Sequence, residues 1–342
     1  MKIAINQIKN TLATYSLLRE LSLINGPNVS EELLNRIMYN SETLPLLGKE
    51  YWWMLFFGLE GEKPVQLMLL IFRKHGKKML FNGKEMILRE FKKNKFQGVT
   101  TGWLYDGEKL LDLGNVNAVT EIQDKKIISE IFGKELMFEG SFPDYRLKIE
   151  EMVDLNLKKA NYLCEKDGQG ACLPPFGLGW VNIFTEAEGV ILGKKFKGTA
   201  HLQKVIGITI LGPFHWGRLF FQDGSFSRFF FVKTGKDSKI YLRKSLEFFD
   251  QKNKEIIKLN NPKIEITKKE DQWFMEGKEE EKSFKIVLEI YAKKQFTGKG
   301  GGSFVYNEYA VIPTEFFLKT KERTINLSNL GKGVGTFEDA YG

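Results

Sequence analysis

Two long runs of apolar and aromatic residues, 51–59 and 65–72, flank a short charged turn in the first quarter of the chain. Such runs around a tight turn predict a β-hairpin in which at least one strand is buried on both faces. The first run contains Trp52 and Trp53. Because successive side chains of a strand point to opposite faces, we expect one indole on each side of the sheet.

Helical patterns are concentrated at the start of the chain. Between residues 2 and 24, Ile, Leu and Tyr recur at close to helical spacing. Ser30 precedes Glu31 and Glu32, the sequence of an N-cap followed by an acidic first turn. We therefore expect a second, short helix that ends near Tyr39. Residues 124–132 show a weaker helical period.

From about residue 50 onward, strand-like segments alternate with turn signals such as Asn82-Gly83, Asp106-Gly107, Asp167-Gly168 and Asp223-Gly224. Asn or Asp before Gly accepts the positive φ of tight hairpins. Regular short strands joined by such turns predict an antiparallel barrel or sandwich and argue against a parallel sheet. Near the end of the chain we expect two separate strands, at 302–311 and 314–320.

We place a domain boundary near residues 207–213, where Gly207 and Gly212-Pro213 bracket a short apolar link. The segments after it have the strand count of one lipocalin-like barrel, and the first half has a similar count behind its helices. The predicted organisation is a helical N-terminal extension over 1–44, a first lipocalin-like barrel over 45–208 and a second over 209–342. The predicted fold class is therefore all-β and antiparallel.

Composition supports two buried cores and limits the partners. The chain has 342 residues, of which 42% are hydrophobic and 28 are Phe. The net charge of +8 comes from Lys residues spread along the chain, which indicates a solvated surface, and no nucleic-acid motif accompanies them. We expect no nucleic-acid partner. The oligomeric state is not predicted.

The number of cysteines and the hydropathy of the chain indicate the cellular compartment of the protein. No apolar run reaches the ~18 residues of a transmembrane helix, and residues 1–24 lack the apolar core of a signal peptide. Cys164 and Cys172 are spaced so that a disulfide across adjacent strands is one possibility. Two Cys in so long a chain suit a reducing compartment better. We expect a cytoplasmic protein.

The sequence lacks the usual motifs of metal-binding and nucleotide-binding proteins. The chain has no HExxH, CxxC, GxSxG or P-loop sequence. Its three histidines are His75, His201 and His215. We therefore expect no metal and no cofactor.

Polar residues gather in the segments 198–205 and 214–224. Strand alternation places His201 and Gln203 on one face, so an imidazole and an amide would point at a ligand if that face lines a cavity. In the next strand His215 shares a face with Gly217, opposite to Trp216 and Arg218. A structural role for each histidine stays open beside the functional one.

Glu308 lies between Tyr306 and Tyr309 in a late strand. It is either a surface residue, a partner of Arg218, or a carboxyl buried in an apolar pocket. Burial raises the pKa of a carboxyl, which can then serve as a proton donor near neutral pH.

Three blocks of this sequence resemble one family. Glu50-Tyr51-Trp52-Trp53, Gln66-Leu67 and Phe72-Arg73 resemble the pattern that opens carotenoid 1,2-hydratase and related lipocalin-like proteins, a superfamily that includes fungal Diels–Alderase-type cyclases. Residues 198–205 and 214–224 resemble the second motif of that family, and residues 331–342 resemble its ending. The resemblance implies two barrels packed side by side, with a hydrophobic ligand in the first barrel or between the two.

The resemblance also implies chemistry, because relatives hydrate, cyclise or isomerise polyenes and isoprenoids. An apolar cavity would fix the reactive conformer, and one polar group would polarise it. The Asp of the family's second motif falls at Gln203 or Lys204, so this acid is missing. His201, Glu308 or Glu338 could substitute for it.

Three hypotheses follow: a protein that binds a hydrophobic small molecule and acts on it, a carrier without chemistry, and a scaffold whose barrels are filled by their own Phe side chains. Trp53 and Trp216 would stack on an apolar chain. Arg73 and Arg218 would hold a polar end of the ligand or bridge to buried carboxylates. The candidate catalytic residues are His201, Gln203 and Glu308, and the candidate ligand-binding residues are Trp52, Trp53, Gln66, Arg73, His215, Trp216 and Arg218.

Overall fold

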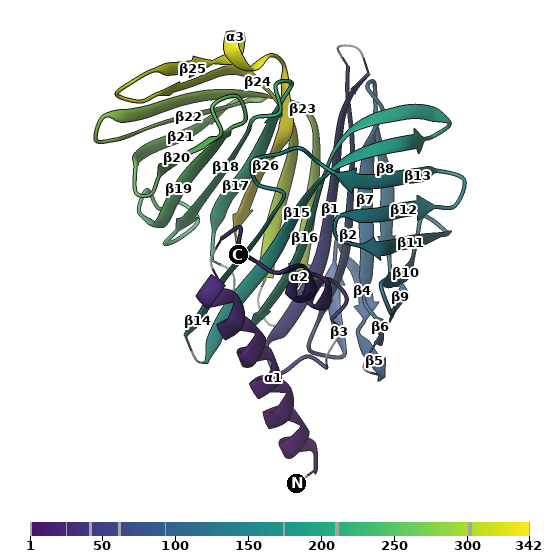
Figure 1. Ribbon diagram of the computed structural model, residues 1–342. Helices are drawn as coiled ribbons and strands as arrows, with labels where there is room; N and C mark the ends of the chain where they lie inside the picture. The colour runs from purple at the N-terminus through teal and green to yellow at the C-terminus, as the bar shows by residue number, and fades with distance from the viewer. Residues whose placement is uncertain are drawn as a thin grey trace. The chain divides into compact units, whose positions relative to one another are not determined.

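The computed structural model describes residues 2–24, 26–40, 43–60, 63–92, 94–173, 175–208, 212–299 and 303–341 (Figure 1). Nearly all of this chain is antiparallel β-sheet, as the sequence predicts. The chain forms two compact units. The first comprises Met1–Ala160, Cys164–Ile210 and Gly298–Gly301, and the second comprises Asn161–Leu163, Leu211–Thr297 and Gly302–Gly342. The predicted link at 207–213 includes residues 209–211, which lie outside the described ranges.

The first unit is built on one long, curled sheet with two helices, and its β3–β4 hairpin lies outside this sheet. The strands of the sheet follow the order β5-β6-β9-β10-β11-β12-β13-β15-β16-β1-β2-β7-β8, with β14 paired to β15. The sheet curls far enough that Thr100 Oγ1 of β7 lies 2.9 Å from Ser129 Oγ of β10. The elements are α1 (Lys2–Ile24), α2 (Glu31–Met38), β1 (Gly48–Glu60), β2 (Lys63–Lys74), β3 (Lys78–Phe81), β4 (Lys84–Ile87), β5 (Arg89–Lys92), β6 (Lys95–Gln97), β7 (Val99–Tyr105), β8 (Leu110–Val116), β9 (Val119–Gln123), β10 (Lys126–Ile131), β11 (Lys134–Ser141), β12 (Asp144–Ile149), β13 (Val153–Lys159), β14 (Lys166–Leu173), β15 (Phe176–Ile191) and β16 (Lys194–Ile208).

The second unit is built on another antiparallel sheet, with the order β20-β19-β18-β17-β26-β24-β23-β22-β21. Its outer strands in this order are β20 and β21, and β25 pairs with β24. The elements are β17 (Phe214–Phe221), β18 (Phe226–Lys233), β19 (Tyr241–Asp250), β20 (Glu255–Leu259), β21 (Lys263–Lys269), β22 (Gln272–Glu279), β23 (Lys282–Lys299), β24 (Ser303–Lys319), β25 (Thr324–Asn326), α3 (Leu327–Leu330) and β26 (Gly333–Tyr341).

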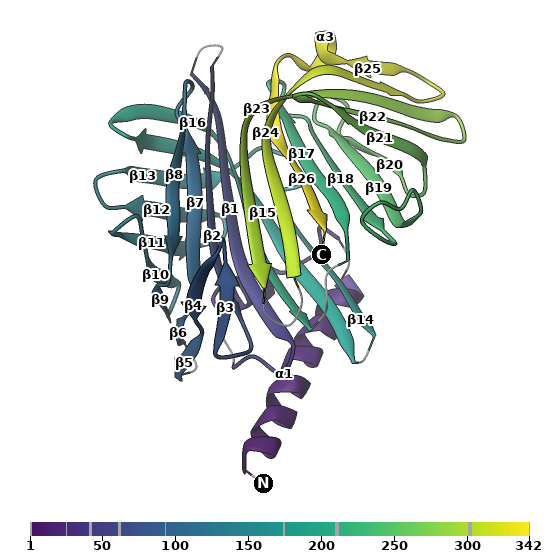
Figure 2. The same cartoon turned by 180° about the vertical axis from the view of Figure 1, so that it is seen from behind.

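The predicted hairpin and the two predicted N-terminal helices are confirmed. β1 and β2 pair from Lys49↔Lys74 to Glu60↔Lys63 around the turn residues 61–62, which lie outside the described ranges. Ser30 Oγ accepts a hydrogen bond of 3.1 Å from the Leu33 amide, so it caps α2. Both views show the C-terminal end of α1 lying across β14 (Figures 1 and 2), where Leu21 packs against Gly168 and Gly170.

Helix α2 fills the interior of the first curled sheet. Leu34 and Met38 belong to the same buried cluster as Trp52 and Phe56 of β1. The Trp52 indole donates a hydrogen bond of 2.7 Å to the Met38 carbonyl, so the last turn of α2 is fixed to β1. The segment 1–44, predicted as an extension, thus contributes side chains to the core of the first unit.

The core of the second unit is rich in phenylalanine, in line with the hypothesis of a barrel filled by its own rings. Phe229 of β18 lies over Gly217 of β17, where a Cβ atom would come within 2.2 Å of the Phe229 ring. Glycine is therefore required at this position for the ring to pack against the strand. The Phe residues of this core are Phe221, Phe229, Phe231, Phe248, Phe284, Phe316 and Phe337.

Three local predictions are wrong. Residues 124–132 are not helical: they include β10, where Ile127, Ser129 and Ile131 are buried with the period of two that is typical of a strand. Asp167-Gly168 is not a turn but part of β14. The predicted strands at 302–311 and 314–320 are one strand, β24. Its Pro313 lies after the last residue paired with β26 and before the first paired with β25, so it falls in the gap between these two ladders.

Candidate functional site

On the core face of the first unit, four residues form what we call the Glu50 cluster: Glu50, Trp52, Arg73 and Lys204. Arg73 forms an ion pair with Glu50 Oε1, and Lys204 Nζ lies 2.6 Å from Glu50 Oε2. The Lys204 ammonium also lies 2.8 Å from the centre of the Trp52 ring. All four side chains are buried. Of the two roles considered for Arg73, the structure displays the bridge to a buried carboxylate.

The Lys204 side chain has an unusual titration. Burial lowers its pKa to about 7, although Glu50 acts to raise it, and the Arg73 charge lowers it further. A lysine in this setting loses its proton near neutral pH, because burial removes the ammonium from bulk water.

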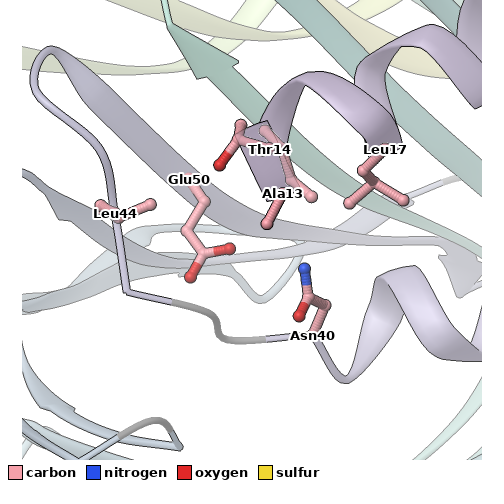
Figure 3. Close-up of a pocket in the computed structure, with 7 residues that line it drawn as sticks. Ala13, Thr14, Leu17, Asn40, Leu44 and Glu50 are labelled. Atoms are coloured by element: carbon pink, nitrogen blue, oxygen red, sulfur yellow. The ribbon is translucent and has the colours of Figure 1, made fainter. Parts of the chain in front are cut away.

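A small hollow borders this cluster between α1 and β1. Its volume is about 20 Å³, and it is lined by Ala13, Thr14, Leu17, Asn40, Leu44, Glu50 and Ile206. Figure 3 shows the Glu50 carboxylate between Leu44 and Asn40, with Ala13 and Thr14 of α1 nearby. This volume suits about one water molecule and is too small for an isoprenoid.

The opposite face of the same strands carries Trp53 and an amide network, by which we mean Asp167, Asn182, His201 and Gln203. Asn182 Oδ1 lies 2.9 Å from His201 Nε2 and accepts a bond of 2.9 Å from Gln203 Nε2. Asn182 Nδ2 donates to Asp167 Oδ1 at 2.6 Å. The predicted common face of His201 and Gln203 is present, and both side chains meet at one oxygen atom.

Aromatic rings enclose the imidazole of this network. The Trp53 ring lies 5.4 Å from the His201 ring, edge to face, and the Phe184 ring stacks on it at 4.8 Å. Gln66 is buried and, by strand alternation in β2, projects to the same side as Trp53. The first unit thus brings Trp53, Gln66, His201 and Gln203 to one face and places Trp52 and Arg73 on the other.

In the second unit, Glu308 of β24 lies directly opposite Glu338 of β26, and Trp216 of β17 is opposite Glu338 on its other side. We call Glu308 and Glu338 the acid pair. Both are buried, as is Arg218 two residues along β17 from Trp216. Directly opposed side chains lie about 5 Å apart at Cβ, so two carboxylates here would repel each other.

The environment of the acid pair favours its protonated form. Burial raises the pKa of Glu338 well above its usual range, and the neighbouring Glu308 raises it further. A hydrogen bond from Tyr306 and the charge of Arg218 act in the opposite direction. The pair therefore shares a proton at a pH where ordinary carboxyl groups are ionised.

His215 projects to the other face of β17, into the core of the second unit. Its Nε2 atom lies 3.1 Å from Asp339 Oδ1. The predicted separation of His215 from Trp216 and Arg218 is therefore present, and His215 does not share a site with the acid pair.

Sequence reasoning overlooked Asp167, Asn182 and Asp339. Asp167 was taken for a turn residue, and Asn182 stands within an unremarkable strand whose register with β16 is a long-range feature. Asp339 could have been found from its place beside Glu338 in the ending of the chain.

Three further features of the described ranges concern carboxylate and histidine clusters, helix hydropathy and the two cysteines. There, no three His, Cys, Asp or Glu side chains cluster so that they could hold a metal ion. Within the same ranges, no helix is both long and apolar enough to cross a membrane. Cys164 precedes β14 and Cys172 lies within it, so they do not face each other across adjacent strands.

Comparisons with known proteins bear on the fold. No family model matches the chain, and no curated protein matches it. Several solved structures are similar, among them the three that follow. A candidate AttH protein from Nitrosomonas europaea is 14% identical over 85% of this chain and 91% of its own, with a TM-score of 0.49. CghA in complex with Sch210972 is 8% identical over 86% and 88%, with a TM-score of 0.49. CghA alone is 9% identical over 87% and 90%, with a TM-score of 0.50. At this identity the likeness to CghA concerns the fold.

Proposed function

We propose that this chain binds an apolar, unsaturated small molecule and donates a proton to it from the acid pair. The observation that supports this proposal is the burial of Glu308 directly opposite Glu338 among aromatic side chains. A buried carboxyl that stays protonated near neutral pH is the group that acid catalysis requires. Glu308 was a candidate from the sequence, and Glu338 adds the partner that holds the proton there.

In this proposal, the acid transfers its proton to one carbon of a C=C bond, and a carbocation forms at the other carbon. The carboxylate left behind is stabilised by Arg218 and by the hydrogen bond from Tyr306. The faces of Trp216 and Tyr306 would stabilise the cation. Loss of a neighbouring proton to the carboxylate gives an isomer. Attack by a second double bond gives a ring and a new cation, and addition of water gives a protonated alcohol; each of these then returns one proton to the carboxylate.

The test is deuterium transfer from solvent. The protein is incubated in D₂O with lycopene as a polyene probe, and the extracted polyene is analysed by mass spectrometry. Proton transfer to carbon predicts a product that carries deuterium, together with loss of this product in Glu338→Gln and Glu308→Gln. Glu315→Gln is the matched control, because Glu315 lies in β24 with 43% of its side chain exposed and pairs with Lys285 at the surface. Equal deuterium in all four proteins would contradict the role of the acid pair.

A carrier function is the second candidate, and the amide network favours it. The Asp of the resembling family falls at Gln203 or Lys204, and the Gln203 amide donates to Asn182 rather than holding an acidic proton. We propose that Trp53, Gln66 and His201 form the binding face of the first unit in that case, with the Trp53 ring as its apolar part. Displacement of cis-parinaric acid, a fluorescent polyene, measures binding. Loss of a stacking ring in Trp53→Ala would weaken it by about 1–3 kcal/mol. Unchanged binding with lowered stability would make Trp53 a core residue only.

A further inference from the structure

The core of the second unit contains two polar rings that the proposed function does not use. His215 of β17 and Trp273 of β22 are only 5% and 6% exposed, and their ring centres lie 5.7 Å apart. The Phe337 ring touches both, at 5.6 Å from His215 and 4.4 Å from Trp273. Tyr309 adds a further ring at 5.7 Å from Trp273. The surroundings are therefore aromatic on several sides.

Each of these rings has a buried nitrogen atom that lacks a hydrogen-bond partner among the described residues: His215 Nδ1 and Trp273 Nε1. Buried polar atoms in folded proteins are nearly always hydrogen-bonded, because an unpaired donor or acceptor loses the bonds it makes in water. Two such atoms on neighbouring rings point to a partner that does not belong to the chain.

Asp339 determines what that partner must offer. The His215 Nε2 atom lies 3.1 Å from the Asp339 carboxylate, which can only accept a hydrogen bond when ionised. When the imidazole is neutral, its hydrogen therefore lies on Nε2, and Nδ1 is an acceptor. The indole Nε1 of Trp273 is always a donor. The site offers one acceptor and one donor.

A hydroxyl group matches this pair, because it donates one hydrogen bond and accepts others. A ketone or a carboxylate only accepts and would leave Nδ1 unsatisfied. The aromatic surroundings favour a ring as the body of the ligand.

The site is within reach of solvent. The Tyr241 ring, half-buried, lies 6.4 Å from His215, and the Asp339 side chain is 21% exposed. Trp273 is paired with Lys268, an exposed residue of β21, and β21 is an outer strand in the order of this sheet.

We propose that His215 and Trp273 bind the hydroxyl group of a small cyclic alcohol in the core of the second unit. This site lies on the opposite face of β17 from Trp216 and Arg218, so it does not rest on the proposed acid chemistry.

The test is isothermal titration of the whole protein with phenol, cyclohexanol and 2-naphthol, and with their methyl ethers. At least one alcohol should bind, and its ether, which cannot donate to Nδ1, should bind about tenfold more weakly. Trp273→Phe keeps a ring and removes the N–H group, and we expect a similar loss of about tenfold for the alcohol. His215→Phe removes the acceptor and should act likewise.

Trp180→Phe is the matched control, because Trp180 lies in β15 of the first unit and the exchange should leave alcohol binding unchanged. Circular dichroism reports whether each variant is folded. If His215→Phe does not fold, the result for Trp273→Phe alone tests the proposal. Three outcomes would overturn the proposal: no alcohol binds, as expected if water alone satisfies the two nitrogens; ethers bind as tightly as alcohols; or Trp273→Phe binds like the unchanged protein.

Discussion

At the scale of single residues, this protein places charged groups where solvation is poor and pairs them there. In the Glu50 cluster two cations share one buried carboxylate. In the acid pair a second buried carboxyl group and the charge of Arg218 act on Glu338 in opposite directions. In both arrangements the free energy of unfolding depends on the protonation state of a buried group. Each arrangement therefore predicts that this free energy changes with pH.

Lys204 should make the folded state more stable as the pH rises above neutrality. Its pKa is about 7 in the folded state and 10.5 ordinarily, so between these values the unfolded chain binds a proton that the folded chain does not. The free energy of unfolding therefore gains about 1.4 kcal/mol per pH unit from this group. Lys204→Met should remove that slope, measured by urea unfolding from pH 7 to 10.

Lys197→Met is the control for this prediction, because Lys197 lies on the same strand with 82% of its side chain exposed. Lys49, whose pKa burial lowers to about 8, keeps its own contribution in both variants. An unchanged slope in Lys204→Met would show that Lys204 keeps its proton in the folded protein.

The acid pair predicts the opposite sign. The pKa of Glu338 is raised above its ordinary value of 4.5, so above that pH the folded state holds a proton that the unfolded chain has lost. Stability therefore falls as the pH rises from about 4.5 towards the raised pKa. Glu338→Gln should gain stability relative to the unchanged protein over this range, measured by thermal unfolding at a series of pH values. A constant difference between the two proteins would contradict a shared proton.

Strand alternation made part of the site predictable. The common face of His201 and Gln203 and the opposed faces of His215 and Trp216 follow from a period of two within one strand. The partners of these residues did not follow, because Asn182 and Asp339 come from neighbouring strands. Their positions depend on the registers of β15 with β16 and of β17 with β26, which are set by tertiary packing.

At the scale of elements, the predictions were accurate where the residues of one short segment are sufficient to determine its secondary structure. The hairpin of β1 and β2 and the Ser30 cap needed only their own residues. The 124–132 segment was misread because Ile127, Ile128 and Ile131 fit a helical period as well as a strand. The continuity of β24 through Pro313 depends on where its partner strands end, which the local sequence does not contain.

Helix α2 should be indispensable for the stability of the first unit. Leu34 is fully buried in the cluster that includes Trp52, so Leu34→Ala should lower the free energy of unfolding by about 2–5 kcal/mol. Glu32→Ala, at an exposed position of the same helix, should change it by less than about 0.5 kcal/mol. Urea unfolding measures both. Similar small effects would mean that α2 is a detachable extension.

At the scale of the whole molecule, each unit has its own buried cluster, so the chain should unfold in two transitions. Scanning calorimetry of the full chain tests this. Lys204→Met should displace one transition and Glu338→Gln the other, because the two residues lie in different units. A single transition that moves with both variants would contradict independent units.

The sequence alone could not predict to which unit certain short segments belong. Asn161–Leu163 belong to the second unit although the first continues on both sides of them, and Gly298–Gly301 belong to the first. Gly298 and Lys299 pair with Phe81 and Leu80 of β3, more than two hundred residues away along the chain. A hydrophobic pattern indicates that a residue is buried, but it does not indicate in which of the two cores that residue lies.

Because Gly217 has no side chain, we expect the residues at positions 217 and 229 to change together during evolution. Any larger residue at 217 collides with the Phe229 ring, and a smaller residue at 229 leaves a void that nothing else fills. Each exchange alone is harmful, whereas an alanine at 217 together with a leucine at 229 would restore much of the volume. Homologues should therefore vary at these two positions jointly, and a lineage that has made the double exchange would have reshaped the wall beside His215 while leaving the acid pair on the far side of β17 untouched.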